Sequence, residues 1–186
     1  MAVIIFFLTM IARGFCLLAI LFVVLPVHSY YVWPKPASIS QGTGSVGVNA
    51  GALQITTTST SKILGRAIQR YQNKLLFPMG AGESSTNPTI FSQLSISVVL
   101  DDDDLQFGVD ESYNLTINSS SATSGTIQAK TVYGAMRGLE TFSQLVDYSD
   151  NSTSYSINCL PTIISDTPRF PWRYFTFYVT QQLANT

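Results

Sequence analysis

The strongest constraint on the fold is the order in which two kinds of hydrophobic periodicity follow one another. Two long segments, 61–77 and 131–147, place their apolar side chains on one face at helical spacing. The alternation typical of half-buried strands occurs in five shorter segments: 53–57, 94–100, 112–118, 125–130 and 154–160. Residues 119–124 form a serine-rich hairpin turn between two of them. This order predicts an α+β fold, with an antiparallel or mixed sheet and both helices packed on one face.

The second helical segment contains two glycines four residues apart, Gly134 and Gly138. A glycine inside a helix costs about 1 kcal/mol relative to alanine. The pair therefore indicates a stripe where another element approaches closely. We expect this helix to be buried on two sides, between the sheet and a neighbouring element.

A formal match to the dinucleotide-binding pattern G-x-G-x-x-G occurs at Gly42, Gly44 and Gly47. Such a site needs a preceding strand, a following helix and an acidic residue about 20 positions further on. Prolines precede the pattern, no helical periodicity follows it, and basic residues occupy the expected acidic region. We therefore expect residues 38–51 to form a loop or an edge strand.

Two charged clusters also have a functional and a structural interpretation. Basic residues recur every four positions on the first helix, at Lys62, Arg66, Arg70 and Lys74. They could bind an anion, but a solvated helix face is the usual explanation. Aspartates occupy residues 101–104 without the alternating ligands and spaced glutamate of a calcium loop. We expect a charged, solvated turn that ends an edge strand.

The composition excludes several classes of function. The chain has 10 basic and 11 acidic residues and a net charge of −1, without the basic excess of nucleic-acid binders. One histidine and two cysteines leave almost no material for a metal cluster or a Cys/His catalytic pair. We expect no nucleic-acid partner, no metal and no cofactor.

The first 27 residues are nearly all apolar, interrupted by Arg13 and Gly14. The longest charge-free run, 14–27, is shorter than the about 20 residues of a membrane-spanning helix and fits the core of a secretory signal. We expect cleavage after Ser29; an uncleaved signal anchor is the alternative. The cleaved chain would keep no histidine and one cysteine, Cys159, which must be buried or paired outside this chain.

Three Asn-x-Ser/Thr sequons support a secretory route, at Asn114, Asn118 and Asn151. Asn151 lies in a polar stretch typical of a surface loop and is the first candidate for glycosylation. Asn114 lies within a strand pattern, so it can carry a sugar only if its face is exposed. Export and delivery to a vacuole or lysosome both remain open.

Four segments match one enzyme family: Trp33-Pro34-Lys35-Pro36, residues 105–117 (LQFGVDESYNLTI), residues 130–145 (KTVYGAMRGLETFSQL) and residues 164–173 (ISDTPRFPWR). They resemble β-N-acetylhexosaminidases of glycoside hydrolase family 20, especially the plant enzymes. The third segment is the most specific, and the resemblance covers residues 31–173.

The resemblance implies the following organisation: a signal peptide over 1–29, the family's non-catalytic, zincin-like N-terminal domain over 30–165, the start of a junction to the catalytic barrel over 166–173, and a divergent tail over 174–186. After Arg173 the sequence departs abruptly from the family, which we interpret as a truncated or alternatively spliced product. No H-E-x-x-H motif is present, so the zincin-like shape implies no zinc.

The family's reaction is substrate-assisted hydrolysis of terminal non-reducing N-acetylhexosamine residues of glycans. In the family a barrel glutamate protonates the leaving oxygen, and the preceding aspartate orients the substrate's acetamido group; the resemblance places neither in this chain. Asp110 and Glu111 look superficially like that pair, but adjacent strand residues point to opposite faces. We expect them to serve turn and strand-end hydrogen bonding. The chain then has no catalytic residue and is inactive without its barrel.

Two other hypotheses remain. The chain could be a stand-alone secreted interaction module that pairs with a full-length barrel or binds sugar. Its tail alternates Phe175, Phe177 and Val179 with other residues and could add an edge strand. The chain could also be a membrane-anchored glycoprotein that keeps its leader.

Overall fold

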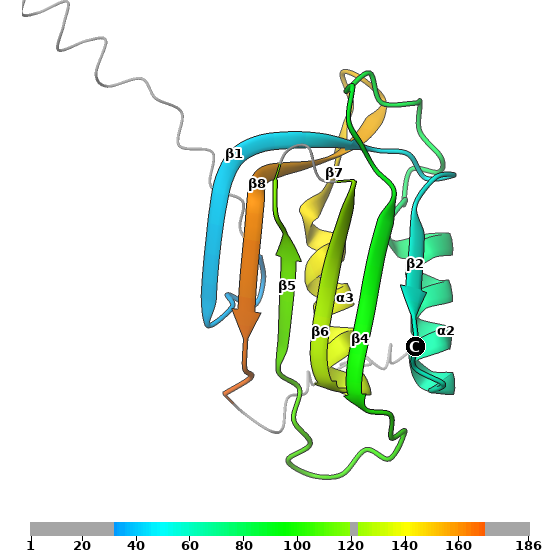
Figure 1. Ribbon diagram of the computed structural model, residues 1–186. Coiled ribbons are helices and arrows are strands. Elements are labelled where there is room, and N and C mark those ends of the chain that lie inside the picture. Colours follow the sequence, from blue (N-terminus) through cyan, green and yellow to red (C-terminus); the bar gives the residue numbers. More distant parts are fainter. Residues whose placement is uncertain (1–31, 120–122, 170–186) are drawn as a thin grey trace, which may run out of the picture.

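The computed structural model describes residues 32–119 and 123–169. Its strands are β1 (Ser38–Val48), β2 (Gln54–Thr57), β3 (Ile90–Phe91), β4 (Gln93–Leu100), β5 (Tyr113–Ile117), β6 (Ser124–Thr131), β7 (Val146–Ser149) and β8 (Ser154–Asp166). Its helical segments are α2 (Lys62–Arg70), the π-helical turn η1 (Tyr71–Leu75) and α3 (Val132–Leu145). Figure 1 looks onto one face of the sheet, with both helices behind it. The predicted α+β arrangement is confirmed.

The eight strands form one mixed sheet with the order β2-β4-β6-β5-β8-β1-β3, and β7 pairs with β8 beside this path. β4 runs parallel to β2 and β6, whereas β5 and β8 run antiparallel to their neighbours. α2 forms the crossover that two parallel neighbours, β2 and β4, require. The predicted hairpin is present, with Tyr113 opposite Ala129 and Leu115 opposite Ile127.

Each helix begins at a hydroxyl side chain that accepts a hydrogen bond from its first turn. Ser61 Oγ accepts from the Leu64 N–H at 3.1 Å, and Thr131 Oγ1 accepts from the Gly134 N–H at 3.2 Å. The first predicted helix has the right start, but its second half is the π-helical turn η1. This turn changes the helical spacing, so Leu75, one of the apolar residues of the predicted helix over 61–77, is 46% exposed.

Close contact between α3 and the sheet is the reason for the glycine pair. A Cβ at Gly134 would lie 2.4 Å from the Ser112 carbonyl oxygen, and a Cβ at Gly138 would lie 2.7 Å from Ile127 Cγ2. α3 packs on β5 and β6 on one side and contacts α2 on another. The expectation that this helix is buried on two sides is confirmed.

Two boundaries differ from the sequence prediction. The helix predicted over 131–147 ends at Leu145, because the following residues pair with β8 as strand β7. The strand predicted over 154–160 continues to Asp166. Pro161 cannot donate a ladder hydrogen bond, and the sheet accommodates this stretch where the β1–β8 register shifts around Gly44. Of the two possibilities for residues 38–51, the edge strand is correct: β1 has only the two-residue β3 beyond it.

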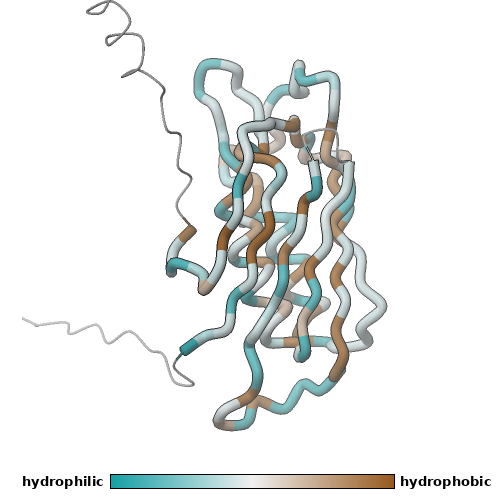
Figure 2. Tube along the Cα trace, turned by 60° about the vertical axis from the view of Figure 1, so that its left-hand side comes forward, coloured by the Kyte–Doolittle hydropathy of each residue, from teal (hydrophilic) through white to brown (hydrophobic). Residues whose placement is uncertain are grey.

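Alternation divides the sheet into an apolar face against the helices and a polar open face. β6 alternates exposed and buried residues along its whole length. Figure 2 shows the same alternation as brown and teal bands along the strands. Several large side chains of the apolar face and of the helices have no exposed surface: Leu64, Phe91, Leu94, Leu115, Ile127, Leu139, Phe142 and Ile164. These side chains form the core between sheet and helices.

The two helices offer a matched test of the close approach. Gly134→Ala should lower the free energy of unfolding by about 1–3 kcal/mol, because the new methyl group meets the Ser112 carbonyl. Gly65→Ala in α2, where nothing lies within 4 Å of the added Cβ, should raise it by about 0.5–1 kcal/mol. Urea unfolding of both variants measures this. Equal effects of the two substitutions would contradict the packing described.

Candidate functional site

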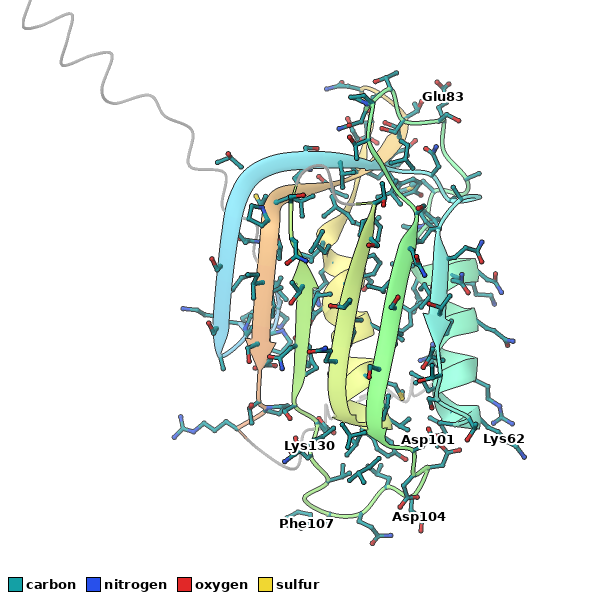
Figure 3. All side chains as sticks on the ribbon, viewed as in Figure 1. Lys62, Glu83, Asp101, Asp104, Phe107 and Lys130 are labelled. Atoms are coloured by element: carbon teal, nitrogen blue, oxygen red, sulfur yellow. The ribbon has the colours of Figure 1, made fainter. Side chains whose placement is uncertain are left out.

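The acidic loop of residues 101–112 connects β4 to β5 and lies at the N-terminal end of α2, at the lower edge of Figure 3. The sequence predicted a solvated turn at the end of an edge strand. The edge assignment is wrong, because β4 lies between β2 and β6 in the sheet. The aspartates are largely exposed, as expected, but Asp101 and Asp103 also hydrogen-bond the segment that leads into α2.

Asp101 and Asp103 bind the hydroxyl-rich segment that precedes α2. Asp101 accepts hydrogen bonds from Ser59 Oγ and, at 2.7 Å each, from the N–H and Oγ1 of Thr60. Asp103 accepts from the hydroxyl of Ser61, the residue that caps the helix. The hydrogen bonds from Ser59 and then Thr60 hold the pKa of Asp101 below its usual range. α2 has no acidic residue in its first turn, so the loop supplies the negative charge that a helix N-terminus favours.

The other end of the loop binds the start of α3. The Asp110 carbonyl accepts from Thr131 Oγ1 at 2.5 Å, and the Asp110 carboxylate lies 3.1 Å from Lys130 Nζ. Hydrogen bonds from Ser112, and then the bond to Lys130, lower the pKa of Asp110 to about 2. Glu111 forms an ion pair with Arg137 at 3.0 Å. The predicted turn and strand-end role of Asp110 is confirmed, and for Glu111 the structure shows the ion pair with Arg137 of α3.

A polar contact also joins the two helices directly. The Tyr71 hydroxyl donates a hydrogen bond to a Glu140 carboxylate oxygen. Burial, and then this bond, raise the pKa of the Tyr71 phenol above its usual range. The Arg70 guanidinium lies 5.9 Å from the centre of the Tyr71 ring. Arg70 belongs to the basic stripe whose other members are Lys62, Arg66 and Lys74, and all four side chains are exposed, as a solvated helix face predicts.

The glycine pattern at Gly42, Gly44 and Gly47 lies inside β1, and strand β2 follows it. A phosphate-binding turn needs the N-terminus of a helix at this point. β1 offers no such helix, so the structural interpretation of this motif is correct.

A shallow groove of about 450 Å³ lies on the open face of the sheet. Polar side chains from four strands line it, among them Ser97, Gln128, Asn114 and Ser165. The strand register places these four residues in one row across β4, β6, β5 and β8. All four are exposed, so the open face presents hydroxyl and amide groups rather than charges at this row.

The structure places the three sequon asparagines on different surfaces. Asn114 is exposed on the open face, beside the groove. The condition for attaching a sugar at this strand position, an exposed face, is therefore fulfilled. Asn118 is exposed just after β5, and the third residue of its sequon, at position 120, lies outside the described residues. Asn151 is exposed in the turn between β7 and β8. Cys159 is buried in β8.

The leader with its cleavage site after Ser29, residues 170–173 of the junction and the tail over 174–186 lie outside the described residues. Within residues 32–119 and 123–169, no three His, Cys, Asp or Glu side chains come together as metal ligands. Over the same ranges, no helix is both long and apolar enough to cross a membrane.

Comparison with protein families identifies the chain. Residues 32–145 match the family described as beta-acetyl hexosaminidase like. The chain belongs to the β-hexosaminidases of glycoside hydrolase family 20. The matched part is the N-terminal domain of these enzymes, and their catalytic part is not within it.

Curated relatives agree with this hexosaminidase assignment. Beta-hexosaminidase subunit A1 of Dictyostelium discoideum is 42% identical over 145 residues, which cover 77% of this chain and 26% of the relative. Beta-hexosaminidase 1 of Arabidopsis thaliana is 37% identical over 158 residues, covering 77% and 29%. The chain thus spans a little over a quarter of the length of these relatives. Because they come from an amoeba and from a plant, a specifically plant-type enzyme stays a prediction.

A solved structure agrees with the fold. The chitobiase of Flavobacterium johnsoniae has a TM-score of 0.54 and 25% identity, over 77% of this chain and 21% of that one. A GH20 exo-β-N-acetylglucosaminidase of Vibrio harveyi, an inactive D437A mutant, has a TM-score of 0.51 and 20% identity, over 77% and 20%, and shows the shared fold alone.

Sequence reasoning missed the carboxylates that bind the α2 N-terminus in this hexosaminidase domain. The sequence does contain the signal for a helix N-terminus, because the hydroxyl residues Ser59 to Ser61 precede an apolar run. Their partners are about 40 positions further along the chain, and local sequence does not show that β4 returns them to this point.

The low pKa of Asp110 predicts a pH-dependent contribution to stability. A carboxylate whose folded pKa is lowered stabilises the fold above its unfolded pKa, near 4, and loses that contribution as the pH falls toward 2. Asp110→Asn should therefore lower the melting temperature at pH 7. The loss in the free energy of unfolding should be less than about 1 kcal/mol, because the ion pair is exposed. The difference from the unsubstituted chain should shrink steadily as the pH falls from about 4 to about 2. Asp150→Asn, in the exposed β7–β8 turn, is the control, and a difference as large at pH 2 as at pH 7 would contradict this origin.

Proposed function

We propose that this domain is the non-catalytic N-terminal part of an enzyme that hydrolyses terminal non-reducing N-acetylhexosamine residues of glycans. The family assignment and the names of the curated relatives support this activity for the whole enzyme. The domain's own contribution is structural: it forms a folded unit against which the enzyme's catalytic domain is positioned.

The carboxylates of loop 101–112 carry the second half of the proposal, that the domain has no turnover of its own. A glycosidase needs a general acid whose pKa is raised toward neutrality. Hydrogen bonds and Lys130 lower the pKa of Asp110 to about 2 instead, and Glu111 is paired with Arg137. Asp110 therefore acts as an ionised structural anchor rather than as a proton donor, and Glu111 is held by its ion pair with α3.

A chromogenic N-acetylglucosaminide assay tests this directly. The purified 186-residue chain should release no more chromophore than a heat-denatured sample of itself, because Asp110 and Glu111 are engaged in structural contacts. A full-length β-hexosaminidase serves as the positive control. Turnover above the denatured control that Glu111→Gln abolishes would contradict the proposal and locate catalysis in the loop.

We infer that the chain enters the secretory pathway and acts in a vacuole, a lysosome or the extracellular space. The apolar leader supports this route, and the exposure of the three sequon asparagines agrees with it. Expressed with its own leader in a eukaryotic host, the chain should be recovered with Tyr30 as its first residue. N-terminal sequencing measures this, and a product that begins at Met1 would favour a retained signal anchor.

A further inference from the structure

We propose that Asn114 carries an N-linked glycan whose first sugars lie in the groove on the open face of the sheet. This inference rests on the proposed secretory route and concerns a surface that the hexosaminidase assignment leaves without a role. The groove, the register of the strands around Asn114 and the exposed apolar side chains beside it each support the proposal.

The alternation of β5 presents the whole sequon to the open face. Tyr113, Leu115 and Ile117 are buried against the helices, so Asn114 and Thr116 point the other way. Asn114 is exposed, and its side-chain amide makes no hydrogen bond within the described part of the chain. Attaching a sugar at this amide therefore breaks no hydrogen bond of the folded domain.

The strands on either side of Asn114 supply polar partners at close range. Gln128 of β6 and Ser165 of β8 are its direct neighbours in register, one strand spacing or about 4.8 Å away on each side. Ser97 of β4 extends the row beyond Gln128. The hydroxyl and acetamido groups of a sugar on Asn114 would find donors and acceptors on both sides. The charged residues that line the groove, Lys130 and Asp166, lie outside this row.

Exposed apolar side chains on the same face are a second reason to expect a glycan there. Ile163 is 50% exposed and lies directly beside Thr116, and Val99, which lines the groove, is 76% exposed. The apolar faces of pyranose rings and the N-acetyl methyl group can shield such side chains from water. A glycan in the groove therefore covers apolar surface that would otherwise contact water.

A free sugar fits this face less well than an attached one. Sugar-binding sites commonly stack the ring on an exposed aromatic side chain, and the aromatic residue that lines this groove, Tyr113, is only 3% exposed. A covalently attached glycan needs no such affinity, because the linkage holds it at a high local concentration. The geometry thus favours a modification site over a binding site.

Site mapping tests the attachment. The 186-residue chain is secreted from mammalian cells, once with its own leader and once with residues 1–29 replaced by an established signal peptide. Peptide N-glycosidase in oxygen-18 water then marks each modified asparagine for mass spectrometry. Asn114 should be marked, Asn114→Gln and Thr116→Ala should each lose the mass of one glycan, and Thr116→Ser should retain it. An unmodified Asn114 in the chain with the established signal peptide would overturn the proposal independently of the leader.

The rate of enzymatic deglycosylation tests the location of the sugars. In the native chain, release at Asn114 should be slow and should become fast after denaturation. The double substitution Gln128→Ala with Ser165→Ala should speed native release about tenfold, the effect of removing two hydrogen bonds of ordinary net strength. The same change at Gln54→Ala and Thr56→Ala, two residues of β2, which lies three strands away from β5 and Asn114, is the control. A glycan released equally fast from the native chain and the groove variant would show that the sugars do not lie in the groove.

Discussion

The close approach of α3 to the sheet is the contact on which the rest of this domain depends. Two positions one helical turn apart, Gly134 and Gly138, have no side chain, and the carbonyl of Ser112, just before β5, and the side chain of Ile127 in β6 occupy that space. α3 is thereby held against the centre of the sheet, and α2 takes the remaining place beside it. The hydrogen bond between Tyr71 and Glu140 joins η1, which continues α2, to α3. One local feature of the sequence thus determines the thickness of the whole layer.

Loop 101–112 supplies negative charge to the N-termini of both helices. Both helices begin at the same end of the sheet, and neither has an acidic residue in its first turn to balance its N-terminal dipole. The loop brings Asp101 and Asp103 to one helix and Asp110 and Glu111 to the other. The Asp110–Glu111 pair, which looks like a catalytic candidate in the sequence, therefore has structural partners.

The sequence correctly predicts the elements that their own periodicity specifies. It does not predict strand bounds or strand order that depend on pairing with a distant strand. The helix over 131–147, its glycine stripe and the hairpin around Leu115 were all predictable, because short-range spacing specifies them. The extension of β8 to Asp166 was not, since pairing with β1 and β5 overrides the presence of Pro161. The central place of β4 was missed for the same reason: local alternation does not show which strand pairs with which. In the site, the role of Asp110 was predicted and the partners of Asp101 were not, because the latter contact joins distant segments.

The two faces of the sheet impose different demands on anything that covers them. The helix face is already filled by apolar side chains, whereas the open face presents short hydroxyl and amide groups around Asn114. A protein domain packed on such a face would bury many polar groups that each need a partner. A hydrated glycan can satisfy the same groups while remaining in contact with water. With a glycan on Asn114, the open face remains in contact with solvent. The surfaces that can then contact the rest of the enzyme are the outer sides of the helices and the loop that exposes Leu105 and Phe107.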